Sequence, residues 1–153
     1  MPDMLVKLYA LPEKVNLEIN GVTIRRALAP EKQTVLKWVE ENFSRHWTGE
    51  CDVAFSRQPV SCFIAVEEKK IVGFACYEAT CKNFFGPTGV LEDMRGRGVG
   101  KVLLLKALFA MRELGYAYAI IGGVGPAEFY EKTVGAKLIE DSTPGVYKGL
   151  LRE

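Results

Sequence analysis

Residues 95–101, RGRGVGK, stand between an apolar and acidic segment, GVLEDM (89–94), and a leucine-rich run, VLLLKAL (102–108). Three glycines and three cations fall within these seven residues. A glycine-rich turn that enters a helix leaves several backbone N–H groups pointing into one space, where the positive end of the helix dipole adds to them. Glycine also permits positive φ and the close approach of a ligand. The stretch therefore predicts a phosphate or pyrophosphate site built from Arg95, Gly96, Arg97, Gly98, Val99, Gly100 and Lys101.

Three nucleotide-binding patterns can be compared with this loop. A Walker A loop would need glycine at position 95 and a hydroxyl at 102, where the chain has Arg95 and Val102. A Rossmann G-x-G-x-x-G would need glycine at 101, where the chain has Lys101. The third pattern, [Q/R]-x-x-G-x-[G/A] at the start of a helix, is satisfied by Arg95, Gly98 and Gly100. The loop thus departs from the Walker A and Rossmann patterns and matches the third pattern.

The surrounding periodicity predicts an α/β domain with a mixed sheet. Helices are expected at 30–43, opened by Pro30, at about 44–56, at 102–114 and at 126–134. A βαβ unit surrounds the loop and consists of the strand at 84–91, the helix at 102–114 and the strand at 116–123. Gly86, Pro87 and Gly89 are awkward in a central strand and favour a bulge there. The expected strands cover residues 4–9, 22–27, 61–66, 71–79, 84–91 and 116–123, with two further candidates at 136–140 and 145–151.

With these elements in place, the sequence resembles the GNAT-type N-acetyltransferases. After the loop, the family has a hydrophobic helix, a strand and a short helix whose pattern here reads Phe129-Tyr130-Glu131, ending at Gly135-Ala136. The resemblance covers about residues 22–151, so the first 20 residues are an N-terminal extension and residues 1–153 form a single N-acetyltransferase domain. It implies a mixed, mostly antiparallel central sheet with flanking helices. Many relatives have an asparagine seven residues before the tyrosine, a position that Gly123 occupies here.

The resemblance also assigns roles to residues. It implies that the loop binds the pyrophosphate of acetyl-CoA, and that Tyr130 is the general acid that protonates the departing thiolate. An acceptor amine would attack the thioester directly, while a strand N–H, from Val90 or Leu91, stabilises the oxyanion. An alternative interpretation of Tyr130 is a half-buried aromatic residue whose hydroxyl contacts solvent. The alternative for the loop is an ordinary turn between a strand and a helix.

The acceptor and the general base are less well determined by the sequence. We expect the acceptor to lie against the helical segment in which Trp38, Phe43, His46, Trp47 and Glu50 cluster, because aromatic and acidic groups suit a cationic amine. Trp38 and Phe43 could equally be core residues. The candidate bases are Glu78, Glu92, Asp93, Glu50 and His46, and water could also remove the proton.

The composition limits which classes of partner, such as nucleic acid, membranes or metal ions, are expected to bind the chain. Twenty Lys and Arg residues balance nineteen Asp and Glu residues, so nothing in the net charge predicts nucleic acid or an anionic membrane as a partner. No apolar window approaches a membrane span, and the charged N-terminus does not match a signal peptide, so a cytoplasmic protein is expected. The spacings of Cys51, Cys62, Cys76 and Cys81 match no zinc pattern, and no metal is expected.

Two functions remain open at this level. The first is an acetyl-CoA-dependent N-acetyltransferase that acts on a primary amine of a small molecule, or of a protein. The alternative is a non-catalytic acetyl-CoA-binding sensor or interaction module, and an NTP-binding protein is disfavoured by the loop. A short N-terminal strand at an open sheet edge would also suit a homodimer.

Overall fold

The computed structural model describes residues 1–152 and contains one seven-stranded mixed sheet. Its strand order is β2-β3-β4-β5-β6-β1-β7, and every neighbouring pair is antiparallel except β5 and β6. The predicted mixed, mostly antiparallel α/β sheet with flanking helices is therefore confirmed. The strands are β1 (Met4–Lys7), β2 (Thr23–Arg26), β3 (Cys62–Glu67), β4 (Lys70–Tyr77), β5 (Phe84–Val90), β6 (Tyr118–Ile121) and β7 (Lys137–Leu138).

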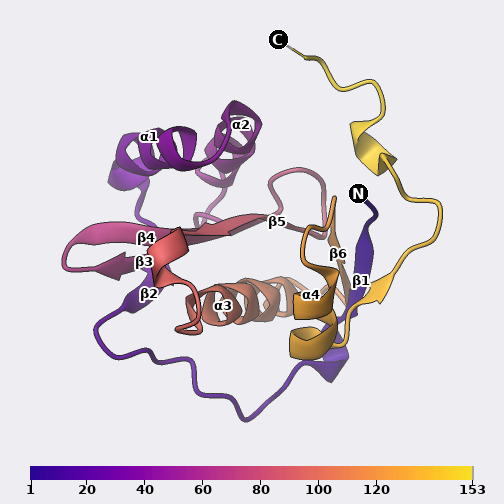
Figure 1. Cartoon of the computed structure of the whole chain (residues 1–153), viewed down its shortest axis with the longest axis horizontal. Helices are drawn as coiled ribbons and strands as arrows, with labels where there is room; N and C mark the ends of the chain where they lie inside the picture. The colour runs from indigo at the N-terminus through magenta and orange to yellow at the C-terminus, as the bar shows by residue number, and fades with distance from the viewer. Residues whose placement is uncertain (153) are drawn as a thin grey trace.

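Helices cover both faces of this sheet. Figure 1 shows α1 (Lys32–Asn42) and α2 (Arg45–Ala54) on one face, with α3 (Val99–Glu113) and α4 (Ala127–Val134) on the other. Pro30 lies in a 3₁₀ turn, Ala29–Glu31, so the first α-helix begins two residues after it. The helix expected from residue 102 begins at Val99, because Gly98 in the left-handed region (φ +83°) ends the turn there.

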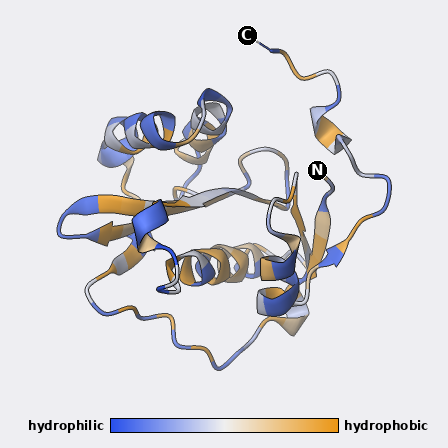
Figure 2. Cartoon of the chain, in the orientation of Figure 1, coloured by the Kyte–Doolittle hydropathy of each residue, from blue (hydrophilic) through white to orange (hydrophobic). Residues whose placement is uncertain are grey.

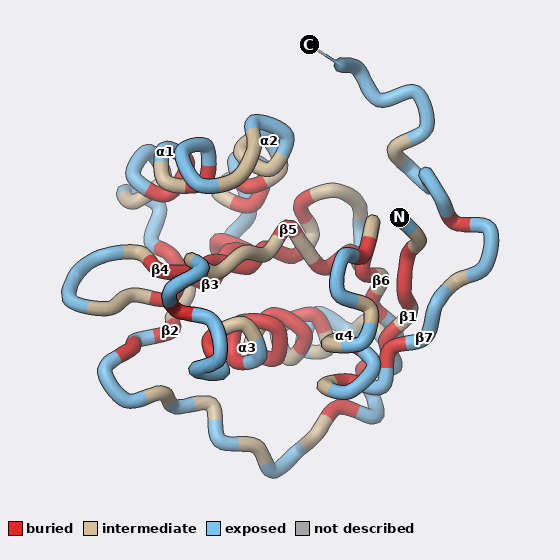
Figure 3. The backbone as a smooth tube through the Cα atoms, in the orientation of Figure 1, coloured by how far each residue is buried: buried red, intermediate tan, exposed pale blue. Residues whose placement is uncertain are grey.

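The central strands β3 and β4 explain why two layers of helices are needed. Their apolar side chains alternate between two cores, as the period of a strand requires. Phe63, Ala65 and Ala75 belong to the core under α3, whereas Ile64 and Phe74 belong to the core under α1 and α2. Figure 3 shows that α3 and the central strands are the most deeply buried elements, and Figure 2 shows their apolar colour. A sheet that is apolar on both faces must be covered on both.

The geometry of β5 creates an opening in the sheet. Its pairing with β6 covers only Phe84↔Ile120 and Phe85↔Ile121, although β5 continues to Val90. Its pairing with β4 shifts in register between Ala75 and Tyr77, next to the Gly86-Pro87 step, in agreement with the bulge that these residues predict. Beyond Phe85 the strands β5 and β6 diverge, and this divergence positions the site described below.

The ends of the chain differ from the sequence predictions. The strand predicted at residues 4–9 ends at Lys7. This strand, β1, lies inside the sheet between β6 and β7, so the N-terminal strand does not form the open sheet edge that was expected. The strand predicted at 145–151 is wrong: Gly145–Tyr147 forms a 3₁₀ turn outside the sheet. The backbone turns in this run instead, because Gly145 and Gly149 have positive φ (+61° and +78°), which an extended strand does not adopt. Within residues 1–152 no helix is long and apolar enough to span a membrane.

Candidate active site

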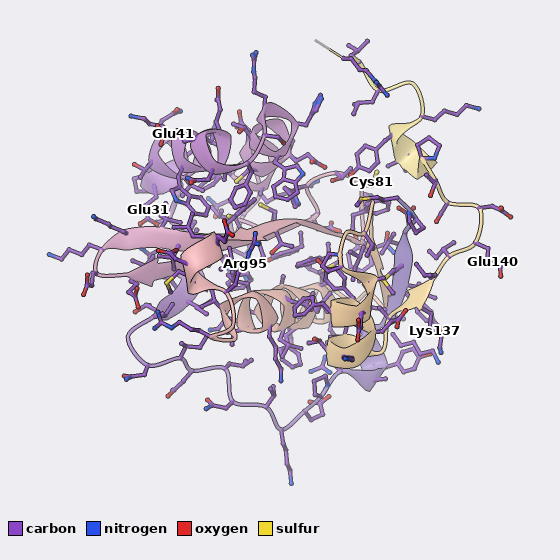
Figure 4. All side chains as sticks on the ribbon, viewed as in Figure 1. Glu31, Glu41, Cys81, Arg95, Lys137 and Glu140 are labelled. Atoms are coloured by element: carbon purple, nitrogen blue, oxygen red, sulfur yellow. The ribbon has the colours of Figure 1, made fainter. Side chains whose placement is uncertain are left out.

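A pocket of about 720 Å³ lies where β5 diverges from β6 and meets the start of α3. Its floor is apolar, with Leu104 and Phe129, and its mouth carries Arg95 and Lys101. Figure 4 shows Arg95 in the turn that precedes α3. Among the described residues no acidic group pairs with either cation, so both remain available to an anion. Of the predicted loop residues, the pocket is lined by Arg95, Gly96, Gly98, Val99, Gly100 and Lys101.

The loop has the backbone geometry of an anion site. Gly96 and Gly98 have φ values of +85° and +83°, a region that side chains with a Cβ rarely adopt. Gly98 is the N-cap of α3, and the first N–H that bonds back within the helix is that of Val102, to the Gly98 carbonyl. The N–H groups of the first turn therefore have no partner inside the helix. An anion at the mouth of the pocket would meet these donors, the helix dipole and two cations.

Arg97 lies apart from its neighbours in the loop. Its guanidinium donates to Glu67 Oε2 at 2.9 Å, to the Asn20 carbonyl and to Met94 Sδ, and it does not line the pocket. In the structure Arg97 fastens the loop to β3 and to the N-terminal segment. The alternation of cations in RGRGVGK thus places one arginine at the pocket and the other behind the loop.

The strand donors can be separated in the same way. The N–H of Leu91 donates to the Val72 carbonyl at 2.9 Å and is not free for a ligand. Bonded and non-bonded pairs alternate in an antiparallel ladder. Since Val90 is the neighbour of Leu91 and is paired with Gly73, its N–H points toward the β6 side, where the strands diverge. Val90 lines the pocket and Leu91 does not, so of the two candidate donors Val90 is the one whose N–H is available at the pocket.

Tyr130 lies at the junction of two pockets. It comes from α4, is 5% exposed, and contacts the rings of Phe85 and Phe129 edge-on at centroid distances of 6.4 and 5.1 Å. It lines the pocket just described and also a second pocket of about 500 Å³. Burial raises the pKa of Tyr130 to about 12. The phenol is therefore protonated at any physiological pH and can act as a proton donor.

The second pocket carries the candidate acceptor residues. One face of α2 contributes His46, Trp47 and Glu50, while Trp38 and Phe43 pack into the adjacent core instead. Glu50 Oε2 accepts a hydrogen bond from the Thr80 hydroxyl and lies 3.4 Å from the Tyr147 hydroxyl. Among the lining residues within 1–152, Glu50 is the only acidic one, so this part of the pocket favours a cationic group.

The remaining base candidates lie elsewhere. Glu78 accepts hydrogen bonds from the Asn83 N–H and the Tyr116 hydroxyl and lines neither pocket. Glu92 and Asp93 are exposed in the 3₁₀ turn after β5 and also line neither pocket. Of the five sequence candidates, only His46 and Glu50 line the second pocket. Their spacing of four residues on one helix is a signal that the sequence already carried.

Sequence reasoning missed two features. Thr80 and Tyr147, which contact Glu50, were not among the predicted site residues: Thr80 follows the strand predicted at 71–79, and Tyr147 lies in the run predicted as a strand at 145–151. The thiols of Cys51, Cys62 and Cys76 converge from α2, β3 and β4 within 4.8 Å of one another. All three are fully buried in the core under α1 and α2, and burial raises the pKa of Cys76. Three thiols could ligate a soft metal ion, but among the described residues no fourth protein ligand joins them, and apolar packing accounts for their position.

The family comparison agrees with this geometry. The model of the acetyltransferase (GNAT) family matches residues 24–136, a span from β2 to the residue after α4 and its glycine cap. No curated protein matched the chain.

Solved structures show the same fold at low identity. A GCN5-related N-acetyltransferase from Sphaerobacter thermophilus is 22% identical with a TM-score of 0.67, over 90% of this chain and 48% of that one. A glucosamine N-acetyltransferase region of a fungal GH3 β-N-acetylglucosaminidase is 14% identical with a TM-score of 0.72, over 90% of this chain and 19% of that one. An aminoglycoside acetyltransferase from an uncultured soil metagenomic sample, in complex with sisomicin, is 17% identical with a TM-score of 0.55, over 74% and 88%. The chain thus spans about half or less of the first two structures.

Proposed function

This chain belongs to the acetyltransferase (GNAT) family, and we propose that it transfers an acetyl group from acetyl-CoA directly to a primary amine of a small, cationic molecule. The observation that carries the proposal is the meeting of two pockets at Tyr130. One pocket has the donors of an anion site, and the other contains a carboxylate. A pocket for each substrate with a proton donor between them is the arrangement that direct transfer requires.

The residues of the first pocket fit coenzyme A. Arg95, Lys101 and the free N–H groups at the start of α3 would hold the phosphates, while the apolar floor and the open edge of β5 would take the pantetheine arm. When bound, the coenzyme supplies the acetyl group as an activated thioester. Val90 N–H would donate to the carbonyl oxygen as negative charge develops there. Tyr130 would donate its proton to the departing sulfur.

The residues of the second pocket fit an amine. Glu50 would attract the ammonium form, and Trp47 offers an aromatic face to the same cation. An alkylammonium must lose a proton before it can attack, and Glu50 or His46 could accept it directly or through water. Two of the similar structures are described as a glucosamine N-acetyltransferase region and an aminoglycoside acetyltransferase, and both named compounds carry amino groups.

The first test of the proposal is binding at the loop. Calorimetric titration should show acetyl-CoA binding and no ATP binding. Gly98→Val should weaken acetyl-CoA affinity at least tenfold, because valine disfavours a φ of +83° and would obstruct close approach of the phosphates to the backbone. Gly115→Val is the matched control, since Gly115 also has positive φ (+101°) but lies beyond the far end of α3. A folded Gly98→Val protein with unchanged affinity would remove the loop from the site.

The second test is turnover. Release of the free coenzyme thiol, followed with a panel of primary amines, separates a transferase from a protein that only binds the coenzyme. Tight acetyl-CoA binding with no turnover of any amine would favour the sensor or interaction module. The presence of a buried, protonated Tyr130 between the two pockets favours the transferase.

A further inference from the structure

The C-terminal segment, residues 139–152, follows the edge strand of the sheet and adds no further strand to it. β1 lies between β6 and β7 and pairs with both, so β7 is the last strand on this side. The segment instead leaves β7 and runs along the outside of the molecule, as the yellow end of the ribbon in Figure 1 shows. Figure 4 shows Cys81, in the loop between β4 and β5, on the side of the sheet that this segment passes.

Asp3 anchors the start of the segment next to the acceptor pocket. The Asp3 N–H donates to Ser142 Oγ at 2.8 Å, and its carbonyl accepts from the Ile139 N–H at 2.9 Å. Its carboxylate accepts from the N–H of Gly123, a residue that lines the pocket, at 3.0 Å. Asp3 and Ser142 are each only 8% exposed. The buried anchor fixes where the following residues can lie.

Tyr147 is the side chain that the segment places in the pocket. Its hydroxyl lies 3.4 Å from Glu50 Oε2. Its ring passes over the strand end after β6: a Cβ added to Gly122 would lie 3.7 Å from the Tyr147 hydroxyl, and one added to Gly123 would lie 3.8 Å from its ring. Tyr147 and Leu150 line the pocket together with Glu50 and Trp47. Tyr147 therefore contacts the same carboxylate that faces the acceptor.

The rest of the segment is weakly held. After Ser142, its backbone hydrogen bonds within the described residues are local, from Tyr147 to Pro144, from Lys148 to Gly145 and from Leu150 to Tyr147. Val146 and Leu150 are 54% and 50% exposed. Beyond Ser142 the segment is therefore held by side-chain contacts: Tyr147 reaches Glu50, and Gly145 lies so close to Asp3 that an added Cβ would be 3.1 Å from Asp3 Oδ2.

We propose that residues 142–150 form a wall of the acceptor pocket and that Tyr147 selects the acceptor amine. The ring limits the bulk of amines that fit between Tyr147 and Tyr130. The hydroxyl holds the Glu50 carboxylate in place for the ammonium group. The substrate class is then a compact primary amine, and amines with large groups beyond the reacting nitrogen are excluded. This inference rests on the proposed transferase function, because it names the determinant of the same pocket.

The experiment compares three variants with a series of primary amines of increasing bulk. Tyr147→Ala should raise the ratio of kcat/KM for the bulkiest amine over the smallest at least tenfold, while the KM for acetyl-CoA changes less than twofold. Tyr147→Phe keeps the ring, so it should keep the size preference and raise the amine KM several-fold with little change in kcat. Val146→Ala, an exposed neighbour in the same turn that does not line the pocket, should change neither quantity. Melting temperatures confirm that the variants remain folded.

The outcomes separate this inference from the proposed function. A wild type that acetylates amines while Tyr147→Ala keeps the same size preference overturns the inference alone. Amine affinity can also be followed without turnover by tryptophan fluorescence, since Trp47 lines the pocket. A wild type that binds amines by size but acetylates none overturns the transferase function. In that case the amine affinities of Tyr147→Ala decide whether Tyr147 sets the size limit of the pocket. A wild type that neither binds nor acetylates any amine overturns both.

Discussion

Tyr130 shows at the scale of one residue how burial and position combine. The side chain is nearly fully buried, which raises its pKa to about 12, yet it reaches the junction of both pockets. Among residues 1–152 no side chain or backbone group is hydrogen-bonded to its hydroxyl, so the hydroxyl is free to donate to a ligand. A tyrosine used only for packing would not need to line two cavities.

Replacing Tyr130 by phenylalanine tests this role. Tyr130→Phe keeps the ring and its contacts but removes the proton, so acetyl-CoA binding should barely change. The kcat should fall by roughly ten- to a thousandfold, the low end reflecting a thiolate that leaves tolerably well without a proton. The measurement is kcat and the acetyl-CoA KM with the best amine. An unchanged kcat with a raised KM would make Tyr130 a binding residue instead.

The same side chain should make stability depend on pH. The folded pKa of about 12 lies above the unfolded value of about 10, so the folded state binds this proton more tightly. Its contribution is fully present below about pH 10 and is lost as the pH rises through 12, to a total of about 3 kcal/mol. Urea unfolding from pH 8 to 11.5 should therefore show wild type losing stability faster than Tyr130→Phe. A constant difference between the two proteins would contradict the buried phenol.

At the scale of elements, the contact between β5 and the turn that joins α1 to α2 connects the core to the proposed acceptor pocket. Gly89 faces the Phe43 ring so closely that an added Cβ would lie 2.5 Å from the ring. Phe43 in turn packs against Trp47 at a centroid distance of 5.3 Å, and Trp47 lines the acceptor pocket. Gly89 weakens β5 as a strand, but because it has no side chain the aromatic layer of Phe43 and Trp47 can pack against β5.

Gly89→Ala should displace that layer. We expect about 1–3 kcal/mol of destabilisation in urea unfolding, because the Phe43 ring must move within a packed aromatic cluster. The same substitution in a Phe43→Ala background should cost much less, since the space it needs is then empty. The double-mutant cycle measures this coupling. Additive effects would mean that the two residues do not share the strain.

At the scale of the whole molecule, the N-terminal strand holds the two ends of the chain and one side of the sheet together. Met4, Val6 and Leu8 are fully buried, and β1 is the strand that joins β6 to β7. Asp3, just before it, carries the anchor of the C-terminal segment. The segment that precedes the family match is therefore part of the structural core.

Deletion of residues 1–8 should abolish cooperative unfolding, because it exposes β6 and β7 and removes three fully buried side chains. Val6→Ala, a milder change, should cost about 1–3 kcal/mol through lost burial and a residual cavity. Truncation after Leu150 is the control and should leave unfolding cooperative. The probe is circular dichroism during thermal and urea unfolding. A stable, cooperative protein without residues 1–8 would show that β1 is dispensable.

The sequence by itself determined what depends on neighbours in the chain. The turn RGRGVGK, the start of a helix at its end, the apolar strands and the helix that carries Tyr130 are local patterns of backbone freedom and hydrophobic period. They were sufficient to predict the sheet class, the family resemblance and six of the seven loop residues as lining of the first pocket, whereas the predicted Arg97 and Leu91 do not line it. The prediction of a final strand at 145–151 failed because an apolar run fits a strand locally, whereas here Gly145 and Gly149 take positive φ and the run forms a 3₁₀ turn without a partner strand within residues 1–152.

Only the tertiary structure decided which distant residues meet. It placed β1 inside the sheet, turned Arg97 toward Glu67, used the Leu91 N–H in the ladder, and left Glu50 and His46 as the acceptor-side candidates. It also brought Tyr147 to Glu50 and three cysteines to one point, although they are far apart in the sequence. The physical reason is that strand pairing and core packing are non-local: they depend on the combined burial of many segments, which no single stretch of sequence encodes.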